Sequence, residues 1–472
     1  MNRRVFLGLT SAAALGLLHT PPGVAARGPE VRIFGCGPAS RYMPRVRACF
    51  VRRQGEYGMR WPGAVYDGES ARRSYARQAA GVARDLRCQI DLRETPLYTP
   101  EEVDAWLTES AQARADGLLV VLLDRQEHAW PAARKAVESG IPAVVFSPVG
   151  SSFTTNTAPL AELPGGCICA TDDFEQVRYG VRMLCARAKL RETRCAVIKG
   201  AERKDVETPL LGTKLRYVPA ADFLAEYEST PADDALEAMA GTYMRHARHV
   251  AGATRQDVVN GLRSYLVAGR ILEREDADAI SMDCLGALGK TDVSLPCIAW
   301  SRMNDDGIPA ACEADVGAIL THCIVQYLFD RPGFQQDPVA ETARDAIIGA
   351  HCSCPTRLNG FDQPPEPYDI GHHHGMRDAV PKTHWREGQR VTCADVELDG
   401  DTPARMLISA GTVLENVAVP PAGGCVVSVM VKFDGDTEAL SFPGFHQVFF
   451  YGDFVRELRQ FCQLAGLPAV VV

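Results

Sequence analysis

The sequence lacks several features that would define a class of protein directly. Its 472 residues contain no basic cluster, no alternation of basic and aromatic residues, no Cys-x-x-Cys pair and no internal repeat. The formal net charge of −9 further disfavours a nucleic-acid surface, and the absent Cys-x-x-Cys spacing disfavours a zinc ribbon. With 46% hydrophobic and 23% charged residues, the composition is typical of a globular protein whose partner is a small molecule.

Residues 1–26 form a segment of a different kind. The pair Arg3-Arg4 precedes an apolar stretch that ends near Leu18, and small residues follow at Ala25-Ala26. This order resembles a twin-arginine export signal, with the mature chain starting near Arg27. The apolar stretch is too short to cross a bilayer, so we expect no stable membrane anchor. We expect an exported, periplasmic protein; the alternatives are an ordinary secretory signal, an uncleaved anchor, or a cytoplasmic protein if the signal is not functional.

The sixteen cysteines allow two interpretations. Their number is even, and an exported protein can form disulfides. Most of them nevertheless lie in apolar runs, as do Cys185, Cys323 and Cys462, which is typical of small buried hydrophobic residues. We predict mainly structural thiols, with one or two disulfides as the alternative.

Strand-like and helix-like runs alternate after the signal, a pattern that indicates α/β domains with parallel sheets. After about residue 345, short segments rich in Val and Ile and separated by Gly, Pro and Asp indicate antiparallel strands instead. We therefore predict two doubly wound α/β domains, over residues 27–166 and 167–345, followed by a C-terminal antiparallel β domain over residues 346–472.

Individual elements follow from the apolar periodicity. Strands are predicted at residues 31–36, 117–123, 141–147, 195–198, 215–218, 279–282, 297–300, 390–398, 404–409, 425–433 and 447–451. Helices are predicted at residues 130–138, after a cap at Asp172, at 315–329 and at 453–465.

Four polar residues stand at positions suited to chemistry. Glu313 lies at a loop-to-helix junction, where the ligand crevice of an α/β sheet forms. Asp337 precedes a proline, His351 ends an apolar run, and His446 begins a bulky apolar strand. Each also has an ordinary structural explanation: a helix-dipole partner, a turn residue or a core histidine, with Asp315 as a helix N-cap.

Together these segments resemble the L-fucose isomerase and L-arabinose isomerase superfamily. Glu313-Ala314-Asp315 is similar to the Glu-x-Asp segment that opens an apolar helix in fucose-type members, and Asp337 follows 24 residues later, like their second acid. The segment from His446 to Pro468 is similar to the arabinose-type C-terminal signature, and Gly349-Ala350-His351 to the context of a further histidine. The resemblance covers residues 311–352 and 444–470 in detail and 30–300 in architecture.

The resemblance implies a fold, a cofactor and an activity. It implies two α/β domains, a β domain, and Mn²⁺ or a similar divalent cation held by Glu313, Asp337, His351 and His446. Glu313 and Asp337 would also be the catalytic acid–base pair of an aldose–ketose isomerase that acts on a free sugar through an enediol. Carboxylates with imidazoles form a mixed oxygen/nitrogen site that suits Mn²⁺. A closed homo-oligomer, a trimer or hexamer, is also implied.

Two other classes remain as alternatives. An exported, non-catalytic sugar-binding protein would not need this ligand set, and a metal-dependent hydrolase would not need the family segments. The adjacent residues His372, His373 and His374 would point in different directions in an extended loop, so we expect a solvated loop there; contact with sugar hydroxyls or a neighbouring subunit is the alternative. Trp385 could stack on a sugar, although a lone tryptophan usually packs internally.

The export signal gives the first testable prediction. Replacing Arg3 and Arg4 together by lysine should leave the precursor in the cytoplasm, because the export receptor reads the arginine pair. Cell fractionation followed by immunoblotting measures this. Normal export of the double variant would contradict the twin-arginine interpretation.

Overall fold

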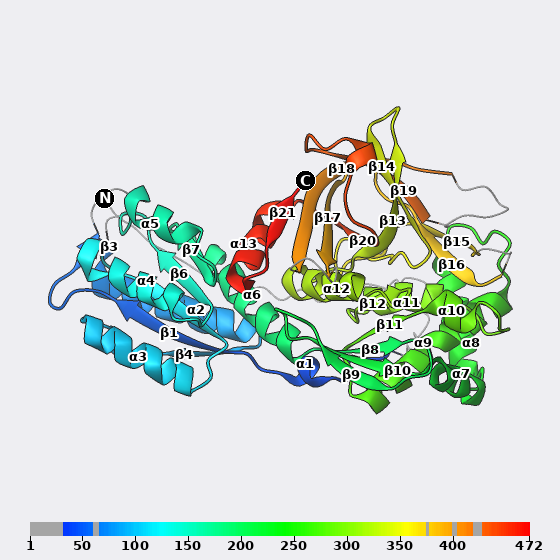
Figure 1. Cartoon of the computed structure of the whole chain (residues 1–472), viewed down its shortest axis with the longest axis horizontal. Coiled ribbons are helices and arrows are strands. Elements are labelled where there is room, and N and C mark those ends of the chain that lie inside the picture. The colour runs from blue at the N-terminus through cyan, green and yellow to red at the C-terminus, as the bar shows by residue number, and fades with distance from the viewer. Residues whose placement is uncertain (1–31, 60–65, 374–376, 399–403, 419–426) are drawn as a thin grey trace, which may run out of the picture. The chain divides into compact units, whose positions relative to one another are not determined.

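Three large sheets organise the chain (Figure 1). The structure, a computed structural model, describes residues 32–59, 66–373, 377–398, 404–418 and 427–472. The proposed export signal lies outside these residues. No helix in the described ranges is long and apolar enough to cross a membrane.

The first sheet is parallel throughout. Its strand order is β4 (Gln89–Leu92), β1 (Arg45–Val51), β5 (Gly117–Leu122), β6 (Ala143–Ser147) and β7 (Gly166–Ala170). Helices α2 (Gly68–Asp85) and α6 (Glu175–Glu192) pack against one face, and α3 (Pro100–Gln112) and α4 (Trp130–Glu138) against the other. Because both faces are covered, the central strand β5 is apolar and buried along its whole length.

The second sheet has four parallel strands and an antiparallel edge. Its order is β12 (Ala310–Cys312), β11 (Ala279–Met282), β8 (Arg194–Ile198), β10 (Lys214–Val218) and the antiparallel β9 (Lys204–Glu207). Edge strand β12 leads through a tight turn into α12 (Val316–Phe329). Helices α9 (Arg255–Glu275) and α11 (Cys297–Asp305) contact one another beside this sheet.

The third sheet closes on itself. Its strands follow the order β17 (Arg390–Glu397), β20 (Gln447–Tyr451), β13 (Phe334–Glu341), β14 (Ala346–His351), β19 (Val427–Phe433) and β18 (Arg405–Asn416), and β18 pairs again with β17. All these pairs are antiparallel, so six strands form a barrel; β21 (Ala469–Val471) is added to β18 in parallel. Valine and aromatic side chains, including Phe334 and Phe449, fill one core of the barrel.

The remaining elements connect these sheets. They are α1 (Pro38–Arg41), β2 (Gly58–Met59), β3 (Tyr66–Asp67), η1 (Gln126–His128), α5 (Thr154–Ala161), α7 (Ala220–Ser229), α8 (Asp234–His246), α10 (Cys284–Leu288), the hairpin β15 (Tyr368–His372) and β16 (Ala379–Thr383), η3 (Ala439–Ser441) and α13 (Val455–Ala465).

The predicted fold class is confirmed at the level of its sheets: two sheets of mainly parallel strands precede a separate antiparallel barrel. The first and last strands of each sheet do not coincide with the domain boundaries predicted at residues 166/167 and 345/346. Strand β7, which begins at Gly166, completes the first sheet, and β13, which begins at Phe334, already belongs to the barrel.

Three local predictions are wrong. Residues 32–36 form no strand, and Phe34 is 66% exposed there. Residues 297–300 are helical and begin α11, because a short buried apolar run suits a helix as well as a strand. Asp172 does not cap α6, which begins at Glu175; its carboxylate instead accepts a hydrogen bond from the Val149 amide at 3.0 Å.

The prediction of structural thiols is confirmed for the described residues. Fifteen cysteines lie in the described ranges; all are free, and all except Cys36 are buried. No two of these fifteen cysteines form a disulfide, so the alternative of disulfides is not met among them.

Close packing of α12 against β17 generates a stability prediction. A Cβ at Gly317 would lie 2.3 Å from the Val396 carbonyl oxygen, whereas a Cβ at Gly81 in α2 has no neighbour closer than 3.9 Å. Gly317→Ala should therefore destabilise the protein by about 1–3 kcal/mol through overpacking. Gly81→Ala, the control, should be neutral or stabilising by up to about 1 kcal/mol, because alanine favours the helix. Denaturant unfolding measures both; equal stability of the two variants would contradict this packing.

Candidate metal centre

Glu313 lies in a strained turn between β12 and α12. The turn is closed by the Asp315 amide, which donates to the Cys312 carbonyl at 3.2 Å. Both central residues are non-glycine with positive φ, +62° at Glu313 and +53° at Ala314. Such backbone strain costs of order 1–3 kcal/mol per residue and concentrates at functional sites. The turn lifts the Glu313 carboxylate out of the core, and its side chain remains 39% exposed.

Asp315 begins α12 and also holds a histidine in place. One carboxylate oxygen caps the helix by accepting from the Ala318 amide at 2.7 Å. The other lies 2.9 Å from Nδ1 of His446. A carboxylate on one ring nitrogen orients an imidazole so that its second nitrogen faces the metal. The sequence predicts only the cap for Asp315, although the Glu-x-Asp spacing is a signal for this second role.

Asp337 is held by its strand pairing. It lies on β13 opposite Ala350 of β14, and Gln336, one residue earlier, is opposite Gln447 of β20. Gln335 connects this strand to the second sheet, since its buried side chain accepts from the Cys312 amide at 2.8 Å. Its side-chain nitrogen also donates to the Cys312 carbonyl at 3.4 Å, so two hydrogen bonds join the strand of Asp337 to the residue before Glu313.

The two histidines form the buried side of the group. His446 precedes β20, and His351 ends β14; both side chains are less than 10% exposed. His446 Nε2 lies 3.1 Å from Asp337 Oδ1 and 3.4 Å from Glu313 Oε2. His351 Nε2 lies 3.9 Å from Glu313 Oε1. One donor atom each from Glu313, His351 and His446 lie within 4.8 Å of one another, and Asp337 reaches the group through His446.

The charge of the group is strongly perturbed. Burial lowers the pKa of His446, but Asp315, Asp337 and Glu313 outweigh this effect and raise the pKa to about 11. A hydrogen bond to His446 lowers the pKa of Glu313, and burial lowers that of His351. Without a metal, three carboxylates thus share one protonated imidazole, which leaves negative charge for a cation to neutralise.

A fourth carboxylate lies behind this group. Asp395 on β17 is buried, and burial followed by repulsion from Asp315 raises its pKa to about 7. The Phe445 backbone amide interacts with it, so Asp395 helps to hold the loop that carries His446. Phe445 itself is 62% exposed, and its ring centre lies 4.5 Å from that of His446.

The donor set fits a divalent cation. Asp337 Oδ1 and His446 Nε2 are buried and face each other at 3.1 Å, and Glu313 Oε2 lies 3.4 Å from the same ring nitrogen. Carboxylate oxygens that converge in this way on one ring nitrogen are placed to share a cation with it. Two oxygen donors and two nitrogen donors suit Mn²⁺ or a similar ion better than a thiolate-preferring metal.

The other sequence candidates lie apart from this group. Trp385 is 2% exposed and packs against Phe334 and Tyr451 in the barrel core. His372 lies 3.2 Å from Asp257, His373 contacts buried thiols, and His374 lies outside the described residues. The predicted divergence of the histidines is confirmed for the first two, but a solvated loop is wrong for them because both side chains are partly buried against partners.

No protein-family model matches the chain, and no curated protein matches it. The interpretation of the site therefore depends on its geometry and on the resemblance of its segments.

The raised pKa of His446 generates a pH prediction. The ordinary pKa of histidine is 6.5, and below that pH the charged His446 imidazole contributes its full stabilisation to the folded protein. This stabilisation decreases at higher pH and is lost as the pH rises through about 11. At pH 7.5, Mn²⁺ must displace that proton, so binding should release about one proton per ion. Calorimetry in two buffers of different ionisation enthalpy measures the release.

The control separates His446 from other histidines. His446→Gln should release close to no proton, whereas His128→Gln, in the first α/β unit, should behave like the unaltered protein. Absence of proton release by the unaltered protein would contradict a charged His446.

Proposed function

We propose that the protein is a metal-dependent aldose–ketose isomerase of the L-fucose and L-arabinose isomerase type. The observation that carries this proposal is the convergence of Glu313, Asp337, His351 and His446, which come from four separate segments, on one group of facing donor atoms. The resemblance of the sequence selected these same four residues as one ligand set. A sugar-binding protein without catalysis has no requirement for two carboxylates and two imidazoles in this arrangement.

Glu313, Asp337 and His446 would hold Mn²⁺, with His351 as a further ligand or support. The ion would supply electrophilic stabilisation of negative charge on the sugar oxygens. The two histidine side chains are buried, while the side chains of Glu313 and Asp337 are 39% and 31% exposed.

The carboxylates would carry out the proton transfer. Conversion of an aldose into a ketose removes a proton from C2 and returns one to C1. The hydroxyl proton of O2 is transferred to O1 in the same conversion. Glu313 has a lowered pKa and is therefore ionised at neutral pH, ready to accept a proton. Asp337, which lies 3.1 Å from the same nitrogen of His446 that Glu313 faces, would serve as its partner. An enediol is the intermediate of this route.

Neighbouring residues would position the substrate and the ligands. Asp315 fixes the ring of His446 through Nδ1, leaving Nε2 toward the metal. The exposed ring of Phe445 beside His446 offers an apolar face for the C–H groups of a sugar. Export to the periplasm and assembly into a trimer or hexamer belong to the same proposal.

The acid–base assignment is tested by amide substitution. Glu313→Gln and Asp337→Asn keep the shape of each side chain but remove the base, so turnover of an aldose panel should fall by about 10²–10⁴-fold. His446→Ala should instead lower metal occupancy, with partial recovery of activity in excess Mn²⁺. The control Glu341→Gln, on the same strand as Asp337, should retain activity. A loss below tenfold in either amide variant would exclude the assigned role.

Solvent isotope exchange tests the route in the same experiment. In D₂O, the enediol route places deuterium at C1 of the ketose or C2 of the aldose, which mass spectrometry detects. Product formed at full rate without any deuterium would favour a hydride shift and remove the acid–base roles of Glu313 and Asp337.

A further inference from the structure

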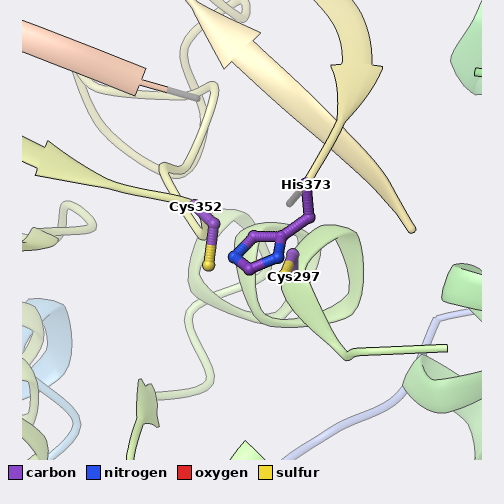
Figure 2. Close-up of side chains that lie close together, drawn as sticks. All are labelled: Cys297, Cys352 and His373. Carbon is purple, nitrogen blue, oxygen red and sulfur yellow. The ribbon is translucent and has the colours of Figure 1, made fainter. Parts of the chain in front are cut away.

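A second group of potential ligands lies in the core and consists of soft donors. The thiols of Cys297 and Cys352 and a ring nitrogen of His373 all lie within 4.8 Å of one another. Figure 2 shows the imidazole ring of His373 directed toward the two thiols. Cys297 and Cys352 are 2% and 5% exposed, so the group is shielded from solvent.

The three residues come from three different segments. Cys297 begins helix α11, Cys352 directly follows strand β14, and His373 directly follows β15 in its hairpin with β16. These elements are distant in the sequence; α11 packs against β16, and the Ser301 hydroxyl of α11 donates to the Cys354 carbonyl at 2.6 Å. An ion bound by all three would connect a helix, the barrel and the hairpin at one point.

Further thiols surround this group. Cys312 interacts with both Cys352 and Cys284, and Cys352 interacts with Cys297, so four buried cysteines form a continuous series. Cys312 is at the end of β12, one residue before Glu313, and its thiol lies 3.3 Å from the Ser353 hydroxyl. Buried cysteines are common as small apolar residues; the feature of this group is that an imidazole nitrogen lies beside its thiols.

The donor chemistry separates this group from the candidate metal centre. Thiolate and imidazole ligands select Zn²⁺ or Cu⁺, whereas carboxylate-containing sets favour Mn²⁺ and Mg²⁺. Two thiolates and one imidazole form a three-ligand zinc set that leaves a fourth position for water or a further donor.

We propose that Cys297, Cys352 and His373 bind a zinc ion as a second metal site, distinct from the Glu313 group. The site acts structurally: Cys352 is bonded to His351 in the chain, and its thiol lies 3.5 Å from His351 Nδ1. Zinc bound at Cys352 would therefore fix the end of β14 and hold His351 toward Glu313. The three zinc ligands are different from the residues that would bind Mn²⁺ or transfer protons in the proposed isomerase. The contact between Cys352 and His351 is the link between the two sites.

A disulfide between Cys297 and Cys352 is the competing explanation in an exported protein. The position of His373 favours zinc, because its ring nitrogen lies within 4.8 Å of both thiols, where it can supply a third ligand beside two thiolates. Both cysteines are also free in the structure.

Cobalt substitution tests the site directly. The full-length protein, purified under reducing conditions and stripped with a chelator, is titrated with Co²⁺, and absorption from thiolate-to-cobalt charge transfer is recorded. We expect this absorption at one ion per chain and its displacement by Zn²⁺. The band reports thiolate ligands only, so an ion bound at Glu313 and His446 does not contribute to it.

Variants assign the band to residues. Cys297→Ser and Cys352→Ser should abolish it, and His373→Asn should weaken Co²⁺ affinity by at least about tenfold, since even supporting residues of metal sites contribute that much. Cys462→Ser, a buried thiol of α13 outside the group, should leave the band unchanged, as should His446→Ala. If the protein shows the thiolate-to-cobalt band but no isomerase activity, the proposed function is contradicted and the zinc site is not.

The proposal is overturned by the unaltered protein alone if, after reduction, it shows no thiolate band with Co²⁺ and binds no Zn²⁺. Mass spectrometry of unreduced peptides that finds Cys297 joined to Cys352 in the protein from the periplasm would overturn it as well. Retention of the band in both Cys297→Ser and Cys352→Ser would place the thiolate ligands elsewhere.

Discussion

The pairing of β13 with β14 on one side and β20 on the other is the constraint on which the candidate metal centre depends. This pairing places Asp337, His351 and His446 on or beside neighbouring strands of one barrel. Because the barrel is closed, the strands cannot shift without breaking several hydrogen-bonded pairs at once. The fourth donor, Glu313, belongs to the second sheet and is brought to the others by Gln335, which bonds to the Cys312 backbone. The buried side-chain amide of Gln335 thus joins the second sheet to the barrel at the site.

Electrostatics then favour a cation at this point. Glu313, Asp315 and Asp337 surround a single imidazole, and Asp395 lies behind them with a raised pKa. Burying carboxylates close together costs free energy unless a positive charge compensates for them. A proton on His446 supplies part of that compensation, and a divalent ion would supply more while satisfying the facing donor atoms. The strained backbone at Glu313 and the tight approach of Gly317 to β17 are consistent with a site whose geometry is maintained at a cost in stability.

The two ligand groups differ in chemistry although they share a boundary. At His351-Cys352, adjacent residues contribute to different groups, His351 to the mixed oxygen/nitrogen group and Cys352 to the soft one. Neighbouring residues in extended or turn conformations project in different directions, so a single backbone segment can supply both. This arrangement would allow two different ions to be selected by donor type within one core.

Much of the fold was open to prediction because hydrophobic periodicity is a local property. The apolar run at β5, helix α4 and strand β20 were each predicted within a residue of their observed bounds. The run at residues 297–300 was not, since a buried helix and a buried strand have the same apolar pattern over so short a length.

The sequence by itself determined the type of each unit and, through the resemblance of its segments, the four residues to examine as ligands. Only the tertiary structure decided which side chains face one another: that Asp315 orients His446, that Trp385 belongs to the core, and that His373 meets Cys297 and Cys352. The physical reason is that these contacts join residues far apart in the chain. Their formation depends on barrel closure and sheet packing, which no local pattern of residues encodes.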